Sequence, residues 1–193
     1  MKKGEFLSII LKSNKTVFSF KEILLMWKET NIYTAKTRIN YYVKNQQLIQ
    51  LRRGLYAKDR NYDKYELATK IYIPTYISFE TVLQQNGLIF QKYNSIFMAS
   101  YKTKELEIDN QNYCFRAIKR DILINQLGVE KKENYHIASS ERAFLDVLYL
   151  NNDYYFDNLS LDWNRVNQLL LIYNNKRMNR KIKELELLNK KIK

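Results

Sequence analysis

The chain of 193 residues has one cysteine and one histidine, and it lacks the run of about 18 apolar residues that a membrane-spanning helix requires. The lone Cys114 cannot form an internal disulfide, so a reducing compartment, the cytoplasm, is the expected location. The opening stretch MKKGEFLSIILKSNK has too short an apolar core for a secretory signal. We therefore expect no association with a membrane.

The same scarcities argue against catalysis and metal binding. One cysteine and one histidine cannot supply the ligand sets of zinc sites. His136 lies in a strand-like run, which favours a structural imidazole, and no serine or cysteine sits at a nucleophile elbow. The four glycines are isolated from one another, which excludes a glycine-rich phosphate loop. We expect no catalytic residue, no metal, no cofactor and no enzymatic activity.

What the chain has in excess is positive charge, and most of it lies at the two ends. Residues 1–60 contain 13 Lys and Arg against 4 Asp and Glu, a net charge of +9. Residues 174–193 contain 8 against 2, a net of +6, whereas residues 61–173 contain 12 against 14, a net of −2. Positive charge concentrated in this way favours a polyanionic partner through counterion release.

The segment from Thr34 to Lys58 predicts a basic helix followed by a basic hairpin. At helical spacing, Ala35, Ile39, Tyr42 and Val43 share one face and are expected to pack inward. The opposite face carries amide, hydroxyl and cationic groups and no glutamate, and these groups suit base edges and phosphates.

Beyond this helix, alternating residues from Ile49 to Arg52, a turn at Gly54 and a return strand from Leu55 to Lys58 predict a two-stranded hairpin with Arg52 and Arg53 at its tip. The two arginines could also be only a solvated turn. The residues expected to contact DNA are Lys36, Thr37, Arg38, Asn40, Tyr41, Lys44, Arg52 and Arg53.

Two helices are expected before this unit, around Phe6–Leu11 and from Phe20 to Thr30, the second capped by Ser19. The order of helices and hairpin predicts a winged helix-turn-helix DNA-binding domain over residues 1–60. Polar residues 58–64 suggest a domain break.

The remaining residues, 61–193, alternate between helical and strand-like patterns and predict a mixed α and β domain that ends in basic helices, so the expected fold class is α+β. The predicted helices cover residues 65–72, 79–86 and 141–150, and the predicted strands cover residues 76–78, 96–101, 106–109 and 113–118. The paired Glu105 and Glu107 are expected to face solvent.

Three separated motifs resemble the AbiEi antitoxin family of type IV toxin-antitoxin, abortive-infection systems. They are LRRGLYAK (Leu51–Lys58), YIPTYISFETVLQQNGLI (Tyr72–Ile89) and HIASSERAFLDVLYL (His136–Leu150). Ser140 stands where the family usually has proline. The resemblance covers nearly the whole chain.

This resemblance implies a cytoplasmic phage-defence protein whose first domain binds double-stranded operator DNA and represses its own operon. A homodimer on the DNA is compatible with this role. The second domain would counter a cognate nucleotidyltransferase toxin of the AbiEii type. Glu141 and Arg142 recur in the third motif, either to lock a helix to a strand or to touch a partner.

The last helix leaves three roles open. Its apolar residues Ile182, Leu185, Leu188 and Ile192 form a stripe on a segment dense in Lys and Arg. The stripe could close the domain core, pair with a second copy or meet an acidic partner. An alternative reading of the whole chain is a protein-interaction module that holds the toxin directly, with DNA binding secondary.

Overall fold

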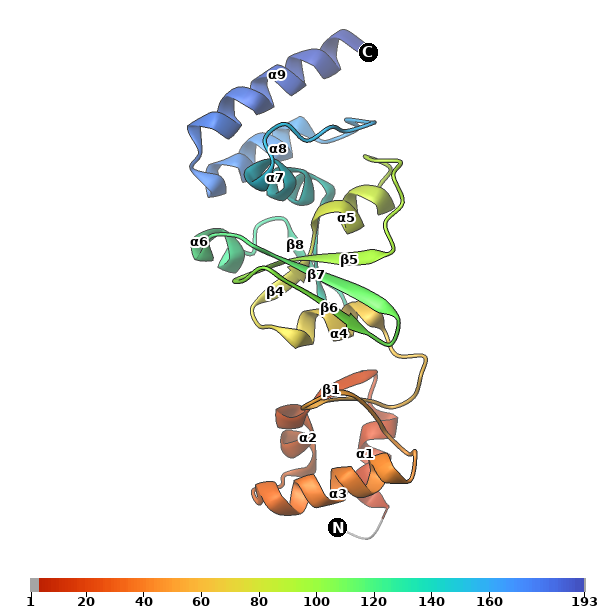
Figure 1. Cartoon of the computed structure of the whole chain (residues 1–193). Helices are drawn as coiled ribbons and strands as arrows, with labels where there is room; N and C mark the ends of the chain where they lie inside the picture. The colour runs from red at the N-terminus through yellow and green to blue at the C-terminus, as the bar shows by residue number, and fades with distance from the viewer. Residues whose placement is uncertain (1–3, 193) are drawn as a thin grey trace. The chain divides into compact units, whose positions relative to one another are not determined.

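The computed structural model describes residues 4–192, with side chains described as far as Asn189. The chain is of the α+β class and divides into two compact units, Met1–Ile71 and Tyr72–Lys193 (Figure 1). Within residues 4–192, no helix is both long and apolar enough to cross a bilayer.

The described part of unit 1, residues 4–71, consists of four helices and a small antiparallel sheet. Its elements are α1 (Glu5–Lys12), β1 (Val17–Ser19), α2 (Phe20–Trp27), α3 (Ile32–Lys44), β2 (Ile49–Arg52), β3 (Leu55–Ala57) and α4 (Lys64–Ile71). The strand order is β1-β3-β2, with Val17 and Ile49 both opposite Ala57. The core between the helices is built on Ile23, Trp27 and Ile39.

Helix α2 begins where the sequence predicts but is shorter. The Ser19 hydroxyl accepts a hydrogen bond from the Glu22 amide, and the Glu22 carboxylate accepts one from the Ser19 amide, so a capping box fixes the first turn. The predicted extension to Thr30 is wrong, because Lys28 adopts a left-handed conformation with φ of 52° and ends the helix after Trp27.

Strand β1 was not expected from the sequence. It has three residues, too few for an alternating pattern, and both Val17 and Phe18 are completely buried. Its partner β3 is formed by residues almost forty positions later, so the pairing depends on tertiary contacts.

Helix α4 belongs to unit 1, although the predicted domain boundary between residues 60 and 61 put it in the second domain. The fully buried Glu66 accepts hydrogen bonds from the Thr16 amide at 2.8 Å and the Thr16 hydroxyl at 2.7 Å. Lys70 donates to the Val17 carbonyl and pairs with Glu66 at 2.9 Å. These bonds attach α4 to the beginning of β1, which explains why the units divide after Ile71.

Unit 2 combines a six-stranded mixed sheet with helices. Its strands are β4 (Thr75–Ile77), β5 (Ser95–Ser100), β6 (Lys104–Ile108), β7 (Gln111–Ala117), β8 (Val129–Lys131) and β9 (His136–Ala138), in the order β6-β7-β5-β4-β9-β8. Its helices are α5 (Phe79–Gln85), α6 (Arg120–Ile124), α7 (Ser140–Leu150), α8 (Trp163–Leu170), the 3-10 turn η1 (Leu171–Tyr173) and α9 (Lys176–Ile192).

Helices α5 and α7 pack side by side against the sheet, and α8 and α9 follow beyond α7 (Figure 1). The helices and strands predicted from the sequence in this unit are present to within two residues at each end, and Glu105 and Glu107 are exposed on β6. The short elements α6 and β8 and the helix α8 were missed.

Candidate nucleic-acid interface

Helix α3 is fixed by a cap at its start and an apolar face along its length. The Asn31 side chain accepts hydrogen bonds from the amides of Tyr33 at 3.0 Å and Thr34 at 3.1 Å. On the inner face Ala35, Ile39 and Tyr42 are buried, as the spacing predicted, while Val43 is only partly buried.

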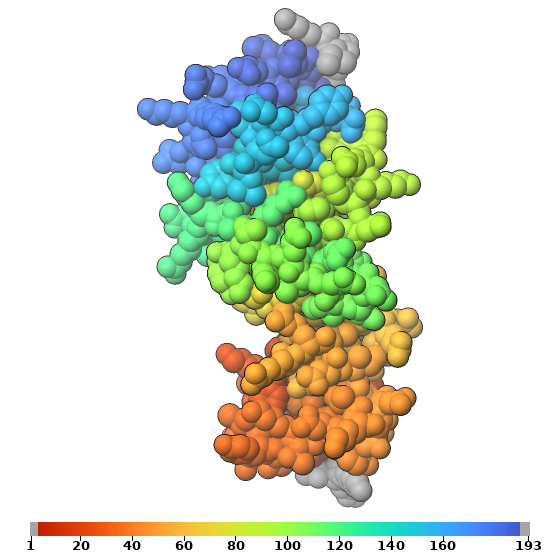
Figure 2. All heavy atoms as spheres, viewed as in Figure 1, coloured from red at the N-terminus to blue at the C-terminus, as the bar shows by residue number. Residues whose placement is uncertain are grey.

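Five of the eight predicted DNA-contact residues lie together on the outer face of α3. Its exposed members are Lys36, Thr37, Asn40, Tyr41 and Lys44. The residues of α3 form part of the surface of unit 1 (Figure 2, orange). The side chains of Asn40 and Lys44 have no hydrogen bond or ion pair within the described part of the chain. One helix face thus offers a free amide and cationic groups to a ligand.

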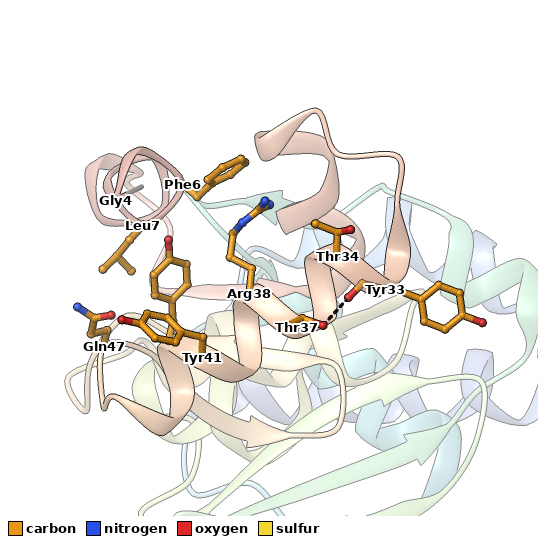
Figure 3. Close-up of a pocket in the computed structure, with 10 residues that line it drawn as sticks. Gly4, Phe6, Leu7, Tyr33, Thr34, Thr37, Arg38, Tyr41 and Gln47 are labelled. Atoms are coloured by element: carbon orange, nitrogen blue, oxygen red, sulfur yellow. Dashed lines mark hydrogen bonds between the residues drawn. The ribbon is translucent and has the colours of Figure 1, made fainter. Parts of the chain in front are cut away.

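Arg38 does not share this face. Its guanidinium carbon lies 3.6 Å from the centroid of the Phe6 ring and 5.5 Å from that of Trp27. Its Nη1 lies 3.2 Å from the Glu29 carboxylate, and only 24% of the side chain is exposed. Figure 3 shows the side chain directed towards Phe6 on α1. Because stacking and an ion pair occupy Arg38 inside unit 1, its prediction as a DNA contact conflicts with this geometry.

The two arginines of the β2–β3 hairpin also differ. Arg53 is exposed beside Gly54, whose φ of 81° permits the tight turn. Arg52 is half-buried, and its Nη1 atom is enclosed without a hydrogen-bond partner among the described residues. The register shifts between Gln50 and Arg52, so an irregular strand end turns Arg52 inward and leaves Arg53 as the cation at the tip.

A hollow of about 950 Å³ lies between α1 and α3 (Figure 3). Phe6 and Leu7 line it from α1, and Tyr33, Thr37 and Tyr41 line it from α3. Tyr33 is 82% exposed and was not among the predicted contacts. Its position four residues before Thr37 on the helix would have indicated the same face.

Two carboxylates of unit 1, those of Glu22 and Glu29, are held by cations. Burial raises the pKa of Glu22, but hydrogen bonds from Lys15 and the Ser19 amide and the charge of Lys70 outweigh it and lower the pKa to about 2. Glu29 accepts from Asn31 and Arg38, and these bonds lower its pKa as well. Both groups stay ionised and paired, which limits the repulsion they would exert on a polyanion.

In unit 2, the segments Tyr72–Ile89 and His136–Leu150 lie next to each other. Strand β4 of the Tyr72–Ile89 segment pairs in parallel with β9 of the His136–Leu150 segment, through Ile77 and Ile137. The helices that follow these strands, α5 and α7, pack together.

A buried polar cluster joins the two segments. The Asp146 carboxylate accepts hydrogen bonds from Tyr173 at 2.6 Å, Ser78 at 2.7 Å and Tyr76 at 2.9 Å. Arg142 lies 3.4 Å from the same carboxylate and donates to the carbonyls of Ile122 and Leu127. Arg142 and Asp146 are both fully buried, so of the two roles considered for Arg142 the structure supports locking the helix in place.

Two other residues considered in unit 2 are Glu141 and Cys114. Glu141 accepts a hydrogen bond from the Ser139 hydroxyl at 2.9 Å and lies 3.7 Å from Arg165. Cys114 is half-buried, and burial raises the pKa of its thiol, which disfavours the nucleophilic thiolate. Among the described residues, no group of three acidic, histidine or cysteine side chains could hold a metal ion.

The stripe on α9 is only partly covered. Met178 and Ile182 are buried, which supports the core-closing role for the first half of the helix. Of the other predicted members, Leu185 is half-buried and Leu188 is 52% exposed. Leu187, which was not part of the predicted stripe, is 60% exposed beside them. The side chain of Ile192, the last member of the predicted stripe, lies outside the described residues.

Comparisons with known proteins returned no matching family model and no matching curated sequence.

Proposed function

We propose that residues 4–57 form a winged helix-turn-helix and that the chain binds double-stranded DNA through α3 and the β2–β3 hairpin. The observation that carries this proposal is the outer face of α3, where a free amide and two exposed lysines lie on a helix without any acidic residue. The hairpin follows α3 directly and carries the exposed Arg53 at its tip. A winged helix-turn-helix makes two contacts with DNA: one helix enters a groove, and the cationic hairpin touches the sugar-phosphate backbone.

The wider role that we propose is that of an AbiEi-like antitoxin. In this reading unit 1 represses the operon that encodes the chain, and unit 2 counters a nucleotidyltransferase toxin. The support is the three motif segments, together with the direct pairing of two of them through β4 and β9. A net charge of +13 for the chain supports a polyanionic partner.

A salt-titrated binding assay tests the proposal. The full chain is measured against its own upstream DNA and against a scrambled duplex of the same length. We expect tighter, salt-sensitive binding to the upstream DNA, because base contacts add to the phosphate contacts only there. Equal affinity for both duplexes would contradict the proposed operator binding. The absence of binding to either duplex would contradict DNA binding altogether.

A second candidate function is direct capture of the toxin, and the exposed Leu187 and Leu188 on a cationic helix favour it. The test is co-purification of the untagged toxin with the full chain and with a Leu187→Ser, Leu188→Ser variant. Toxin retained by the first and lost by the second would support contact through α9. Failure of the full chain to retain toxin at micromolar concentration would remove this candidate.

A further inference from the structure

The face that α3 offers to a ligand differs in one respect from that of a general DNA-binding helix: it has no available guanidinium. The commonest base-specific contact in the major groove is a bidentate hydrogen bond from arginine to the O6 and N7 atoms of guanine. Arg38 is the only arginine of α3. It lies 3.6 Å from the Phe6 ring and is paired with Glu29, so guanine recognition by it would require both contacts to break.

The group that is free to read a base edge is the Asn40 amide. It is exposed and without a hydrogen-bond partner in the described part of the chain. A carboxamide can both accept from N6 and donate to N7 of adenine, the bidentate pattern that an asparagine matches best. The free polar group on this helix therefore suits an adenine.

The side of α3 that lines the hollow also carries two exposed aromatic rings. Tyr33 and Tyr41 are 82% and 51% exposed. The Thr37 hydroxyl between them donates to the Tyr33 carbonyl at 3.0 Å, which leaves the methyl group and the acceptor lone pairs of Thr37 for an outside contact. The thymine C5-methyl is the one apolar group that a base pair presents in the major groove. The rings of Tyr33 and Tyr41 and the methyl group of Thr37, which follow one another along the helix at intervals of four residues, thus complement thymine.

The flanking charge identifies duplex DNA as the occupant of this surface. Lys36 and Lys44 are exposed on the same helix, and α3 carries no acidic residue. A protein partner would meet two tyrosine rings bordered by two exposed lysines, of which Lys36 has, within the described residues, only a ring contact, with Phe20 at 6.0 Å. A duplex supplies both methyl groups for the rings and phosphates for the lysines.

We propose that α3 reads A·T base pairs, with Asn40 on adenine and with Tyr33, Thr37 and Tyr41 against thymine methyl groups. This inference rests on the proposed DNA-binding function and specifies the sequence class that the site prefers. It makes Tyr33 and Asn40 specificity-determining residues.

The first experiment is a selection of duplexes from a pool with a randomised central segment, bound by the full chain at moderate ionic strength. We expect enrichment of A·T pairs in the bound fraction. Enrichment of G·C pairs, or no enrichment in a pool that does bind, would overturn this inference and leave DNA binding in place. A pool that shows no salt-dependent binding would overturn both this inference and the DNA-binding proposal.

The second experiment removes only the methyl groups. The selected duplex is remade with uracil in place of each thymine of the central segment. Burying one methyl group is worth about 0.8 kcal/mol, so we expect affinity to fall about fourfold for each thymine contacted. Equal affinity for the thymine and uracil duplexes would overturn the assignment.

Matched variants of the full chain locate the contact. A double variant, Tyr33→Ala with Tyr41→Ala, should keep only the part of the difference between the two duplexes that the Thr37 methyl group contributes. Tyr155→Ala, which removes a ring of unit 2 that is 77% exposed, should keep the whole difference. Asn40→Ala should reduce the preference for adenine at one position by roughly 5- to 150-fold, the range of one bidentate contact. An undiminished difference between the thymine and uracil duplexes in the double tyrosine variant would count against the aromatic contact.

Discussion

Arg38 and Lys44 are cations on the same helix, but their surroundings differ at the scale of single residues. Arg38 stacks on Phe6 and pairs with Glu29, and 24% of its side chain is exposed. Lys44 is exposed in the last turn of α3. We infer that Arg38 stabilises the packing of α3 against α1 and α2, whereas Lys44 is available to a phosphate.

Replacing Arg38 with alanine should therefore affect stability rather than the salt dependence of DNA binding. We expect the free energy of unfolding to fall by about 1–2 kcal/mol, through loss of the cation–π contact and the partly buried ion pair. The slope of binding affinity against salt should stay unchanged, whereas Lys44→Ala should reduce it by about 0.9, the value for one phosphate contact. A reduced slope for Arg38→Ala at full stability would show that Arg38 touches DNA after all.

The lowered pKa of Glu22 leads to a prediction about how the stability of unit 1 depends on pH. Its folded-state pKa of about 2 lies below the ordinary value of 4.5, so its ionised form stabilises the folded state. This contribution is fully present above pH 4.5 and is lost as the pH falls from 4.5 towards 2. After allowance for solvent screening we expect it to be about 1–2 kcal/mol.

Thermal unfolding measured across that pH range tests this prediction. A Glu22→Gln variant should be less stable than the parent at neutral pH and should lose less stability on acidification. Glu107→Gln, which changes an exposed carboxyl of unit 2, is the control and should follow the parent curve. Parallel curves for the parent and Glu22→Gln would contradict the assignment.

At the scale of elements, hydrogen bonds from the side chains of Tyr76 and Tyr173 to Asp146 connect β4, α7 and η1. Tyr173→Phe removes the hydroxyl that donates to Asp146 at 2.6 Å and should destabilise unit 2 by about 2 kcal/mol, as expected for a buried hydrogen bond to a charged group. Tyr149→Phe, on the ring that packs against Tyr173, is the matched control and should change stability by less than about 0.5 kcal/mol. Chemical denaturation measures the free energy of unfolding of both variants. Equal values for Tyr173→Phe and Tyr149→Phe would show that the Asp146 cluster does not hold these elements together.

The β2–β3 hairpin leads to a prediction about its two arginines. Because Arg53 is exposed at the tip and Arg52 is half-buried, Arg53→Ala should lower the salt slope of DNA binding by about 0.9 and Arg52→Ala by less. Lys104→Ala, which removes an exposed charge from β6 in unit 2, should leave the slope unchanged. If Arg52→Ala had the larger effect, the irregular strand end would not decide which arginine reaches the backbone.

At the scale of the whole molecule, the division after Ile71 predicts which fragment folds by itself. A fragment of residues 1–71 should unfold cooperatively, whereas residues 1–60 lack the α4 groups that satisfy the Thr16 amide and hydroxyl. Circular dichroism during heating should give a lower Tm for the shorter fragment. The longer fragment with Glu66→Ala should behave like the shorter one, and equal Tm values for all three would contradict the boundary.

The amino-acid sequence by itself determined those features that depend on local patterns. Helical spacing identified the buried face of α3, the Ser19 cap identified the start of α2, and alternation with a glycine turn identified the β2–β3 hairpin. The concentration of charge at the ends is likewise a property of the sequence. Such signals suffice because caps, turns and periodicity act over a few neighbouring residues.

Tertiary structure decided what depends on residues far apart in the chain. Strand β1 exists because β3 pairs with it, and α4 joins unit 1 because Glu66 reaches Thr16. Arg38 could not be separated from the outward residues of α3 by spacing alone, since a long side chain at the border of a helix face can turn either way. The ring of Phe6 and the carboxylate of Glu29, placed by other elements, draw its charge inward.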